Sequence, residues 1–216
     1  MNPDNSALAN YEALFTRPAD AVFNDLESYA QLLRKWQRVQ NLVSRETLDQ
    51  LWVRHFADSL QLLSHLRPSD SWLIDIGSGG GFPALPLAIA TNGGPIRFTL
   101  VEPNQRKASF LRTVVRELKL NVEVRAVRCD ALDSRETQRA DLFTARALAS
   151  LDTLCEMLFP LMGESSRALL LKGREHVDER QQAAAHWQFN VVLTPSDTDS
   201  NAVIMELSGL QSPQVP

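Results

Sequence analysis

The stretch Asp-Ile-Gly-Ser-Gly-Gly-Gly-Phe-Pro, residues 75–83, decides the fold of this chain. It ends the β-rich run SWLIDIG (71–77) and opens the apolar helical run PALPLAIAT (83–91). A chain that turns sharply from a strand into a helix needs glycines, since they leave room for a ligand to approach the backbone. Read from Gly79, the turn fits Gly-x-Gly-x-x-Ala, a relaxed form of the dinucleotide-binding fingerprint. These residues predict the first strand and helix of an open α/β sheet with its ligand at this turn.

Short β-rich and helical runs alternate along the rest of the chain. We expect further strands at 96–102, 122–128, 141–146, 167–173, 189–195 and 202–209, and helices at 104–119, 150–161 and 177–187. Such alternation is typical of right-handed βαβ units and a parallel sheet with helices on both faces. The last two strands are joined by the short polar turn SDTDSN, which predicts an antiparallel edge. The predicted fold class is therefore α/β and Rossmann-like, with a seven-stranded, mostly parallel sheet.

The residues before this sheet are expected to be helical. Apolar residues recur at three- and four-residue steps between Val22 and Trp36 and again between Leu48 and Leu63, and Asp20 is placed to cap the first helix. Pro68 then breaks the pattern. We therefore expect an N-terminal helical extension at 1–68, a sheet domain at 69–210 and a disordered tail at 211–216.

The composition excludes several classes of protein. The chain has 216 residues, 44% hydrophobic and 22% charged, which is enough apolar material for a full core. Cys129 and Cys155 form no CxxC or Cys/His cluster, so we expect no zinc module and no other metal. No apolar run reaches the roughly 18–20 residues of a membrane span, and the N-terminus does not resemble a secretory signal. We expect a cytoplasmic protein that does not contact membranes.

The charge is unevenly distributed along the chain. The net charge is −4, yet residues 97–146 hold 11 Lys and Arg against 7 Asp and Glu. The expected helix at 104–119 carries Arg106, Lys107, Arg112 and Arg116 among them, and the helical extension adds Arg34, Lys35, Arg38, Arg45 and Arg54. Basic clusters of this kind are typical of surfaces that bind phosphates. A solvated charged face is the alternative interpretation.

Carboxylates stand at the end of each of the first three expected strands. Asp75 precedes the glycine turn, Glu102 ends the second strand and Asp130 follows the third. They suit, respectively, an ammonium or water in the turn, a pair of ribose hydroxyls and an adenine amino group. No lysine follows the glycines at the spacing of a nucleoside triphosphate loop. S-adenosylmethionine has this combination of groups, although Glu102 and Asp130 could instead be plain loop caps.

Several longer stretches resemble one known family. They are DIGSGGGFPALPLAI (75–89), VEPNQRKASFL (101–111), TARALASL (144–151) and LLLKG (169–173), preceded by KWQRVQNLVSRET (35–47) and RHFADSL (54–60). Together they resemble the bacterial small-subunit ribosomal RNA (guanine-N7) methyltransferases, formerly called glucose-inhibited division protein B, over residues 25–175. The resemblance implies a class I S-adenosylmethionine-dependent methyltransferase fold. It also implies transfer of a methyl group to N7 of one guanosine in 16S rRNA.

The resemblance also assigns cofactor contacts by position. These fall on Gly77, Phe82, Ala131, Leu132 and Arg146. With the residues of the turn and the strand ends, the expected cofactor-binding set is Asp75, Gly77, Gly79, Phe82, Glu102, Asp130, Ala131, Leu132 and Arg146. The chain departs from the family where it reads Cys129-Asp130-Ala131-Leu132, because the family commonly has a Glu after a small residue there. It also has Ala84 where the family usually has Gly.

The expected chemistry needs no general base. Guanine N7 carries a lone pair, so it can attack the methyl group directly once it is positioned. The strand at 141–146 ends in Thr-Ala-Arg and not in the Asn/Asp-Pro-Pro-aromatic motif used on exocyclic amines. We expect Arg146 to orient the substrate, unless it pairs with Asp75 or Glu102.

Two further residues are expected to contact substrate, and two to pack the extension. Lys172 is expected to contact a phosphate, with an edge charge as the alternative, and Asn41 to form the lip of the site, with a helix C-cap as the alternative. His55 and Asp58 are expected to hydrogen-bond to each other, with a metal-binding or general-base role as the alternative.

The expected partner is 16S rRNA in the small ribosomal subunit or its precursor, bound by a monomer. The alternative functions are a class I methyltransferase acting on a small molecule or a protein, a dinucleotide-binding oxidoreductase, and an S-adenosylmethionine-binding ribosome assembly factor.

Overall fold

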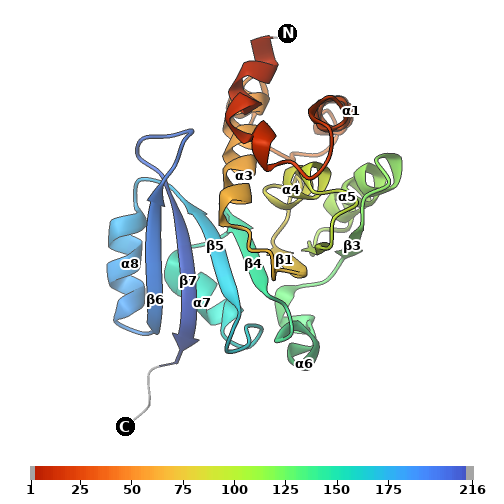
Figure 1. The fold of residues 1–216 in the computed structure, drawn as a ribbon. Helices are drawn as coiled ribbons and strands as arrows, with labels where there is room; N and C mark the ends of the chain where they lie inside the picture. The colour runs from red at the N-terminus through yellow and green to blue at the C-terminus, as the bar shows by residue number, and fades with distance from the viewer. Residues whose placement is uncertain (1–2, 213–216) are drawn as a thin grey trace.

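The computed structural model describes residues 3–212 and contains one seven-stranded sheet (Figure 1). Its strands are β1 (Trp72–Ile76), β2 (Arg97–Val101), β3 (Val122–Arg125), β4 (Leu142–Arg146), β5 (Arg167–Lys172), β6 (Gln188–Pro195) and β7 (Val203–Gln211). Their order is β3-β2-β1-β4-β5-β7-β6. The first five strands are parallel, whereas β7 runs antiparallel to both β5 and β6. The predicted fold class, including the antiparallel edge, is confirmed.

The sheet separates two hydrophobic cores. In each central strand, successive residues enter opposite cores, as in the pairs Leu73 and Ile74, Leu142 and Phe143, and Leu169 and Leu170. This is the two-residue alternation that pleated strands impose. Helices α4 (Ala84–Ala90) and α5 (Gln105–Glu117) contribute to one core, and α7 (Leu151–Leu158) and α8 (His176–Ala184) contribute to the other. Two short helices of the β3–β4 connection, η4 (Cys129–Ala131) and α6 (Ser134–Thr137), were not anticipated from the sequence.

The helical extension packs on the same face of the sheet as α4 and α5 (Figure 1). It contains the 3₁₀ helix η1 (Pro3–Leu14), α1 (Ala19–Gln37), α2 (Arg45–Leu48), the π-helical turn η2 (Trp52–Ala57), α3 (Asp58–Leu60) and the 3₁₀ helix η3 (Gln61–His65). Buried side chains of the extension, such as Tyr29 and Phe56, share one core with Phe98 of β2. The extension therefore covers the sheet and is not separated from it by a solvated linker.

Three details differ from the sequence-based expectations. Asp20 lies in the first turn of α1 and caps nothing, because Pro18 occupies the N-cap position. The second helical run is broken into α2, η2 and α3, and π-helical turns of this kind frequently occur at functional sites. The expected tail at 211–216 begins inside β7, and its residues 213–216 lie outside the described part of the chain. Within residues 3–212, no helix combines the length and the apolar character needed to cross a bilayer.

Candidate active site

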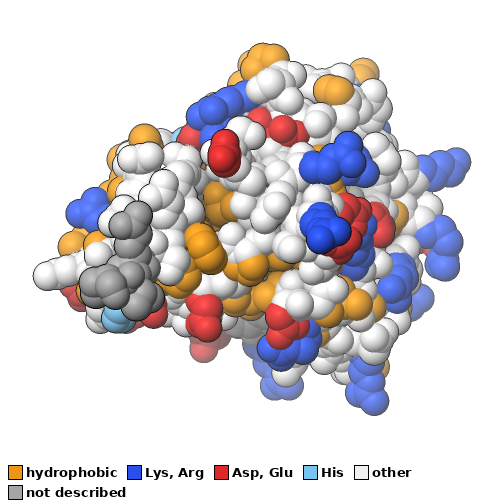
Figure 2. Space-filling model, turned by 90° about the horizontal axis from the view of Figure 1, so that it is seen from below, with side chains coloured by type: hydrophobic (Ala, Val, Ile, Leu, Met, Phe, Trp, Pro, Cys, Tyr) orange, Lys and Arg blue, Asp and Glu red, His pale blue; other side chains and the backbone are white. Residues whose placement is uncertain are grey.

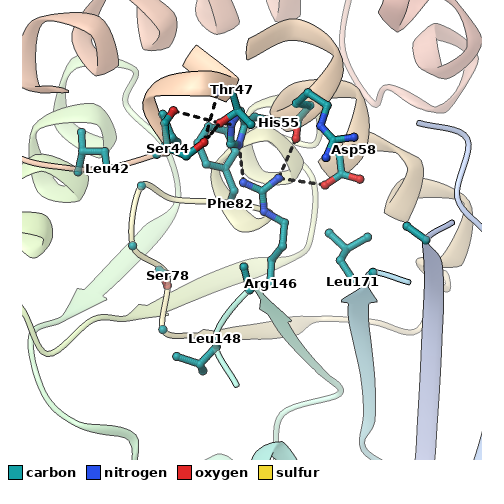
Figure 3. A pocket seen from close by; sticks show the side chains of 18 of the residues that line it. Leu42, Ser44, Thr47, His55, Asp58, Ser78, Phe82, Arg146, Leu148 and Leu171 are labelled. Atoms are coloured by element: carbon teal, nitrogen blue, oxygen red, sulfur yellow. Dashed lines mark hydrogen bonds and ion pairs between the residues drawn. The ribbon is translucent and has the colours of Figure 1, made fainter. Parts of the chain in front are cut away.

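A cavity of about 1040 Å³ opens at the carboxyl ends of the central strands (Figure 3). Its walls come from the loop after α1, the π-helical turn η2, the glycine turn, the tips of β2, β4 and β5, and the β6–β7 loop. It lies where the strand order reverses between β1 and β4, the usual ligand position in open α/β sheets. Typical small-molecule pockets measure roughly 300–1,000 Å³, so this cavity has room for a cofactor and a nucleobase together.

The glycine turn is held in a conformation that side chains disfavour. Gly77 and Gly79 have φ values of 68° and 55°, in the left-handed region. A Cβ atom on Gly77 would lie 2.5 Å from Cδ1 of Leu148, so the turn also packs closely against the segment after β4. The backbone N–H of Gly77 donates to the carbonyl of Val101 over 2.9 Å, which ties the turn to the end of β2. Both glycines line the cavity.

Glu102 connects the glycine turn to the tip of β2. Its Oε2 accepts a hydrogen bond from the N–H of Gly79 (2.8 Å), and its Oε1 accepts one from the N–H of Asn104 (2.8 Å). The carboxylate is nearly buried yet lines the cavity. Each oxygen has two lone pairs, so both can still accept from hydroxyl groups of a ligand. Glu102 thus combines a structural contact with the position expected of a ribose-binding carboxylate.

Asp75 lies beneath the turn and not in the cavity wall. Its side chain is fully buried, and Oδ1 accepts a hydrogen bond from the Thr144 hydroxyl (2.7 Å). Oδ2 has no hydrogen-bond partner among the described residues. Burial raises the pKa of Asp75 to about 7, against the opposing effect of hydrogen bonds from Ser78 and Thr144. The Asp75 carboxyl is therefore buried below the turn and does not face the cavity, so the structure does not place it for the expected direct contact with a ligand ammonium.

Arg146 is the central polar residue of the cavity (Figure 3). Its Nη1 donates to Asp58 Oδ2 (2.9 Å) and to the carbonyl of Arg54 (3.0 Å), and its Nη2 donates to Nδ1 of His55. The alternative pairing of Arg146 with Asp75 or Glu102 is wrong, because the extension supplies nearer acceptors. The expected hydrogen bond between His55 and Asp58 is also wrong, since both side chains bind this guanidinium.

His55 is a neutral acceptor for Arg146. A guanidinium only donates, so Nδ1 of His55 must accept and the ring proton must reside on Nε2, which donates to the Thr47 hydroxyl (2.8 Å). Burial, together with the positive charges of Arg146 and Arg54, lowers the pKa of His55 to about 3. Both ring nitrogens are therefore occupied at neutral pH.

The β6–β7 loop completes this network from the other end of the chain. Thr198 donates to Oδ1 of Asp58 (2.9 Å), and Arg54 forms an ion pair with Asp199 (3.1 Å). The loop therefore closes one side of the cavity and fixes the Asp58 carboxylate for Arg146. Sequence reasoning missed this contribution, because SDTDSN has the composition of an ordinary polar turn.

Phe82 forms an aromatic wall of the cavity. Its ring stacks on Tyr29 with centroids 5.5 Å apart, and the Arg146 guanidinium carbon lies 5.0 Å from its centroid. Tyr29 also donates a hydrogen bond to the carbonyl of Gly80. Phe82 therefore positions Arg146 and the glycine turn at the same time.

The remaining expected site residues divide into two groups. Asn41 lines the cavity, and the C-cap alternative for it is wrong, because Arg38 caps α1. Lys172 also lines the cavity, but its ammonium pairs with Glu179 and donates to the carbonyl of Ala149 (2.9 Å). Its charge is already compensated, which argues against the expected phosphate contact.

Asp130, Ala131 and Leu132 do not line the cavity. Asp130 is exposed and forms an ion pair with Arg128 over 3.1 Å. The chain after β3 forms the short helix η4, which contains Asp130 and Ala131 and has Leu132 at its C-cap. Within residues 3–212, no group of three or more His, Cys, Asp or Glu residues is arranged to hold a metal ion.

Comparison with known proteins gives consistent matches. The family model for rRNA small subunit methyltransferase G matches residues 22–201. The ribosomal RNA small subunit methyltransferase G of Cereibacter sphaeroides is 42% identical over 187 residues, which covers 86% of this chain and 89% of that protein. The protein of the same name from Gluconobacter oxydans is 44% identical over 183 residues, 85% of this chain and 91% of its own.

Solved structures share the fold at lower identity. A TehB-like SAM-dependent methyltransferase from Corynebacterium glutamicum superposes with a TM-score of 0.54 at 14% identity, over 84% of this chain and 96% of that one. A ribosomal protein L11 methylase from Lactobacillus delbrueckii superposes with a TM-score of 0.55 at 14% identity, over 72% of this chain and 78% of its own.

Proposed function

The chain belongs to the family of rRNA small subunit methyltransferase G, and from this premise we propose that it transfers a methyl group from S-adenosylmethionine to N7 of one guanosine in 16S rRNA. The family match supports this RNA substrate over the alternative of a small molecule or a protein. The observation that carries the proposal is the cavity at the switch point of the sheet, which places the glycine turn, the Glu102 carboxylate and the Arg146 guanidinium in one space.

The residues around the glycine turn suit S-adenosylmethionine. Gly77 and Gly79 expose backbone without side chains, and Glu102 offers carboxylate lone pairs to the ribose hydroxyls. Phe82 supplies an apolar surface beside them. When bound, the cofactor provides an electrophilic methyl group. We retain Asp130, Ala131 and Leu132 as the proposed adenine contacts. This proposal requires that the adenine end of S-adenosylmethionine extends beyond the cavity toward η4.

The acidic and histidine side chains of the cavity all take part in hydrogen bonds within the chain, which fits a reaction at N7 that needs no general base. The His, Asp and Glu side chains that line it are His55, Asp58, Glu102 and Asp199, and each accepts a hydrogen bond from a neighbouring residue. Held by the glycine turn and Glu102, S-adenosylmethionine would supply a methyl group that the guanine N7 lone pair can accept, with the sulfonium sulfur as the leaving group. No proton has to be removed before this step. Methylation of an exocyclic amine, in contrast, needs an acceptor for a proton.

Arg146 is the proposed substrate-orienting residue. Its side chain is 16% exposed and is held by Asp58 and His55, so its remaining N–H groups point in a fixed direction. A fixed guanidinium can bind guanine O6 or an adjacent phosphate and leave N7 free to attack. Asn41 contributes a second polar group at the lip of the cavity, and Lys172 acts through its ion pair with Glu179 as a support for the β5 tip.

We further propose that the extension at 1–68 forms one side of the substrate site on the sheet domain at 69–210. We also propose that the active form is a monomer. The substrate proposed here, the small ribosomal subunit or its precursor, places the enzyme in the cytoplasm.

The proposal is tested by transfer of labelled methyl from S-adenosylmethionine to purified small subunits that lack N7-methylguanosine. Borohydride and aniline treatment then maps the product, because it cleaves RNA at N7-methylated guanosine. Cleavage at a single guanosine is the expected result. Label at another atom or in protein contradicts the proposal, as does cofactor binding without any label.

A further inference from the structure

Two segments of the chain carry basic residues and no acidic ones. Residues 28–45 contain Arg34, Lys35, Arg38 and Arg45, and residues 103–116 contain Arg106, Lys107, Arg112 and Arg116. They are more than fifty residues apart in the sequence. From the sequence alone they count as two separate features.

The fold brings the two segments together beside the cavity. The first is mostly α1 and the second mostly α5, two helices that Figure 1 labels. The rings of Trp36 on α1 and Phe110 on α5 pack with centroids 5.7 Å apart. Both segments also reach the cavity, which Arg45 and Lys107 line from the two sides. The end of α1, the loop that follows it and the start of α5 therefore form one continuous surface at the cavity mouth.

Six residues of this surface, the basic ridge, have uncompensated charges. They are Arg34, Lys35, Arg38, Arg45, Arg106 and Lys107, and no ion pair involves any of them within residues 3–212. All are exposed except Lys107, which is half-buried. Several basic residues elsewhere are paired, for example Arg125 with Glu136 and Arg128 with Asp130. Figure 2 shows this mixture, with Asp and Glu side chains among the Lys and Arg on the side of α5, β3 and α6.

Fold stability does not explain the basic start of α5. Arg106 and Lys107 lie in the first turn of the helix, where the positive end of the helix dipole disfavours cations, and that turn contains no acidic residue. Arg34 and Lys35, in the last turn of α1, are in the favourable position for cations. The α5 pair is therefore placed unfavourably for the stability of the helix, and an anion from outside the chain would relieve this cost.

We propose that the basic ridge binds phosphate groups of the RNA strand that leads into the cavity, which guides the target guanosine to Arg146. This inference rests on the proposed function. Phosphate contacts position a nucleic acid without reading its sequence, and each adds to the salt dependence of binding. The ridge thus supplies affinity and direction, whereas the cavity recognises the base.

The test compares two double variants that change the net charge equally. R38Q/R106Q neutralises two ridge residues outside the cavity wall, and R135Q/R139Q neutralises two exposed residues at and just after α6, which lies far from α1 in Figure 1. Binding of a labelled, unmodified 16S rRNA transcript is measured by fluorescence anisotropy over a series of KCl concentrations. Removing one phosphate-binding charge lowers the slope of log K against log salt by roughly 0.7 to 1.

We expect R38Q/R106Q to lower that slope by about 1 to 2 and R135Q/R139Q to leave it unchanged. If the salt slope changes equally in the two variants, or does not change in R38Q/R106Q, the proposal that the basic ridge binds phosphates is overturned. Circular dichroism and cofactor affinity check that both variants keep the wild-type fold. The methylation assay on small subunits separates the two proposals. If the wild-type enzyme methylates N7 but R38Q/R106Q keeps the wild-type salt slope, only the proposed role of the basic ridge is refuted. If R38Q/R106Q lowers the salt slope but the wild-type enzyme does not methylate N7, only the proposed reaction is refuted.

Discussion

Neutral His55 holds Arg146 in place, and the substitution that tests this most directly is His55→Asn. The asparagine Oδ1 takes the place of Nδ1, so it still accepts a hydrogen bond from Arg146 but cannot be protonated near neutral pH. The hydrogen bond to Thr47 is lost, so we expect the variant to be less stable by about 1 kcal/mol at pH 7.

The magnitude of the pH effect follows from the two pKa values. Burial and the charges of Arg146 and Arg54 hold the pKa of His55 at about 3 in the folded chain, against about 6.5 in the unfolded chain. Because the folded pKa is depressed, the stability contributed by His55 is fully present above pH 6.5 and is lost as the pH falls toward 3. Each pH unit in this window is worth about 1.36 kcal/mol, so the wild type loses about 2.7 kcal/mol through His55 between pH 6.5 and 4.5.

The assay is urea unfolding of both proteins at pH 7 and pH 4.5. The other three histidines are present in both, so their effects cancel in the difference. We expect the variant to be about 1 kcal/mol less stable than wild type at pH 7 and more stable by about 1–2 kcal/mol at pH 4.5. A matched variant, His55→Gln, keeps a polar group toward Thr47 but loses the acceptor for Arg146, so its methyl transfer should fall below that of His55→Asn. A difference in stability that is the same at both pH values would refute the reasoning.

Three further predictions concern the turn and the guanidinium. Asp75→Asn should stabilise the chain more at pH 8 than at pH 5, and the difference measured by urea unfolding should be about 2.7 kcal/mol. The reason is that the pKa of Asp75 is raised to about 7, so the wild type loses stability as the pH rises from 5 to 7. An equal gain in stability at both pH values would contradict this prediction. Gly77→Ala should lower the free energy of unfolding by about 1–2 kcal/mol because of the positive φ, and by a further amount because the new Cβ meets Leu148. The double variant with Leu148→Ala should regain only the part lost through the Leu148 contact, which thermal unfolding measures. Arg146→Lys should lower kcat/KM on small subunits on the order of 10- to 100-fold, because an ammonium cannot reproduce the forked hydrogen bonds. Arg54→Lys, in an exposed ion pair, should change kcat/KM a few-fold at most, and similar losses in both variants would argue against the orienting role.

The sequence predicted the architecture well because strands and helices depend on local patterns. The alternation of β-rich and helical runs located all seven strands, and the glycine turn located the cavity. The site was predicted less completely. Glu102 lies in the cavity wall, where its position at the end of β2 indicated, whereas Asp130 is exposed and paired with Arg128, so its contact with adenine stays a prediction. The short helix η4 after β3 was not predicted, because three residues are too few to show a helical periodicity in the sequence.

The contacts of charged side chains were the least predictable part of the site. Arg146 pairs with Asp58, 88 residues away in the sequence, and Lys172 with Glu179 on α8. The acidic residue that lies nearest to Arg146 or to Lys172 depends on how the extension and α8 pack on the sheet. Proximity of this kind is not encoded in any local motif.

Local patterns were enough to predict the order of the elements and the glycine turn, because side-chain periodicity and the tolerance of glycine for positive φ act over a few residues at a time. The resemblance of longer stretches indicated the family. The folded chain was needed to see that the extension, the tip of β4 and the β6–β7 loop meet around Arg146, and that α1 and α5 join two basic segments into one surface. The physical reason is that charge pairing and surface potential depend on distances through space, and those distances are set when distant segments bury their apolar faces against the same sheet.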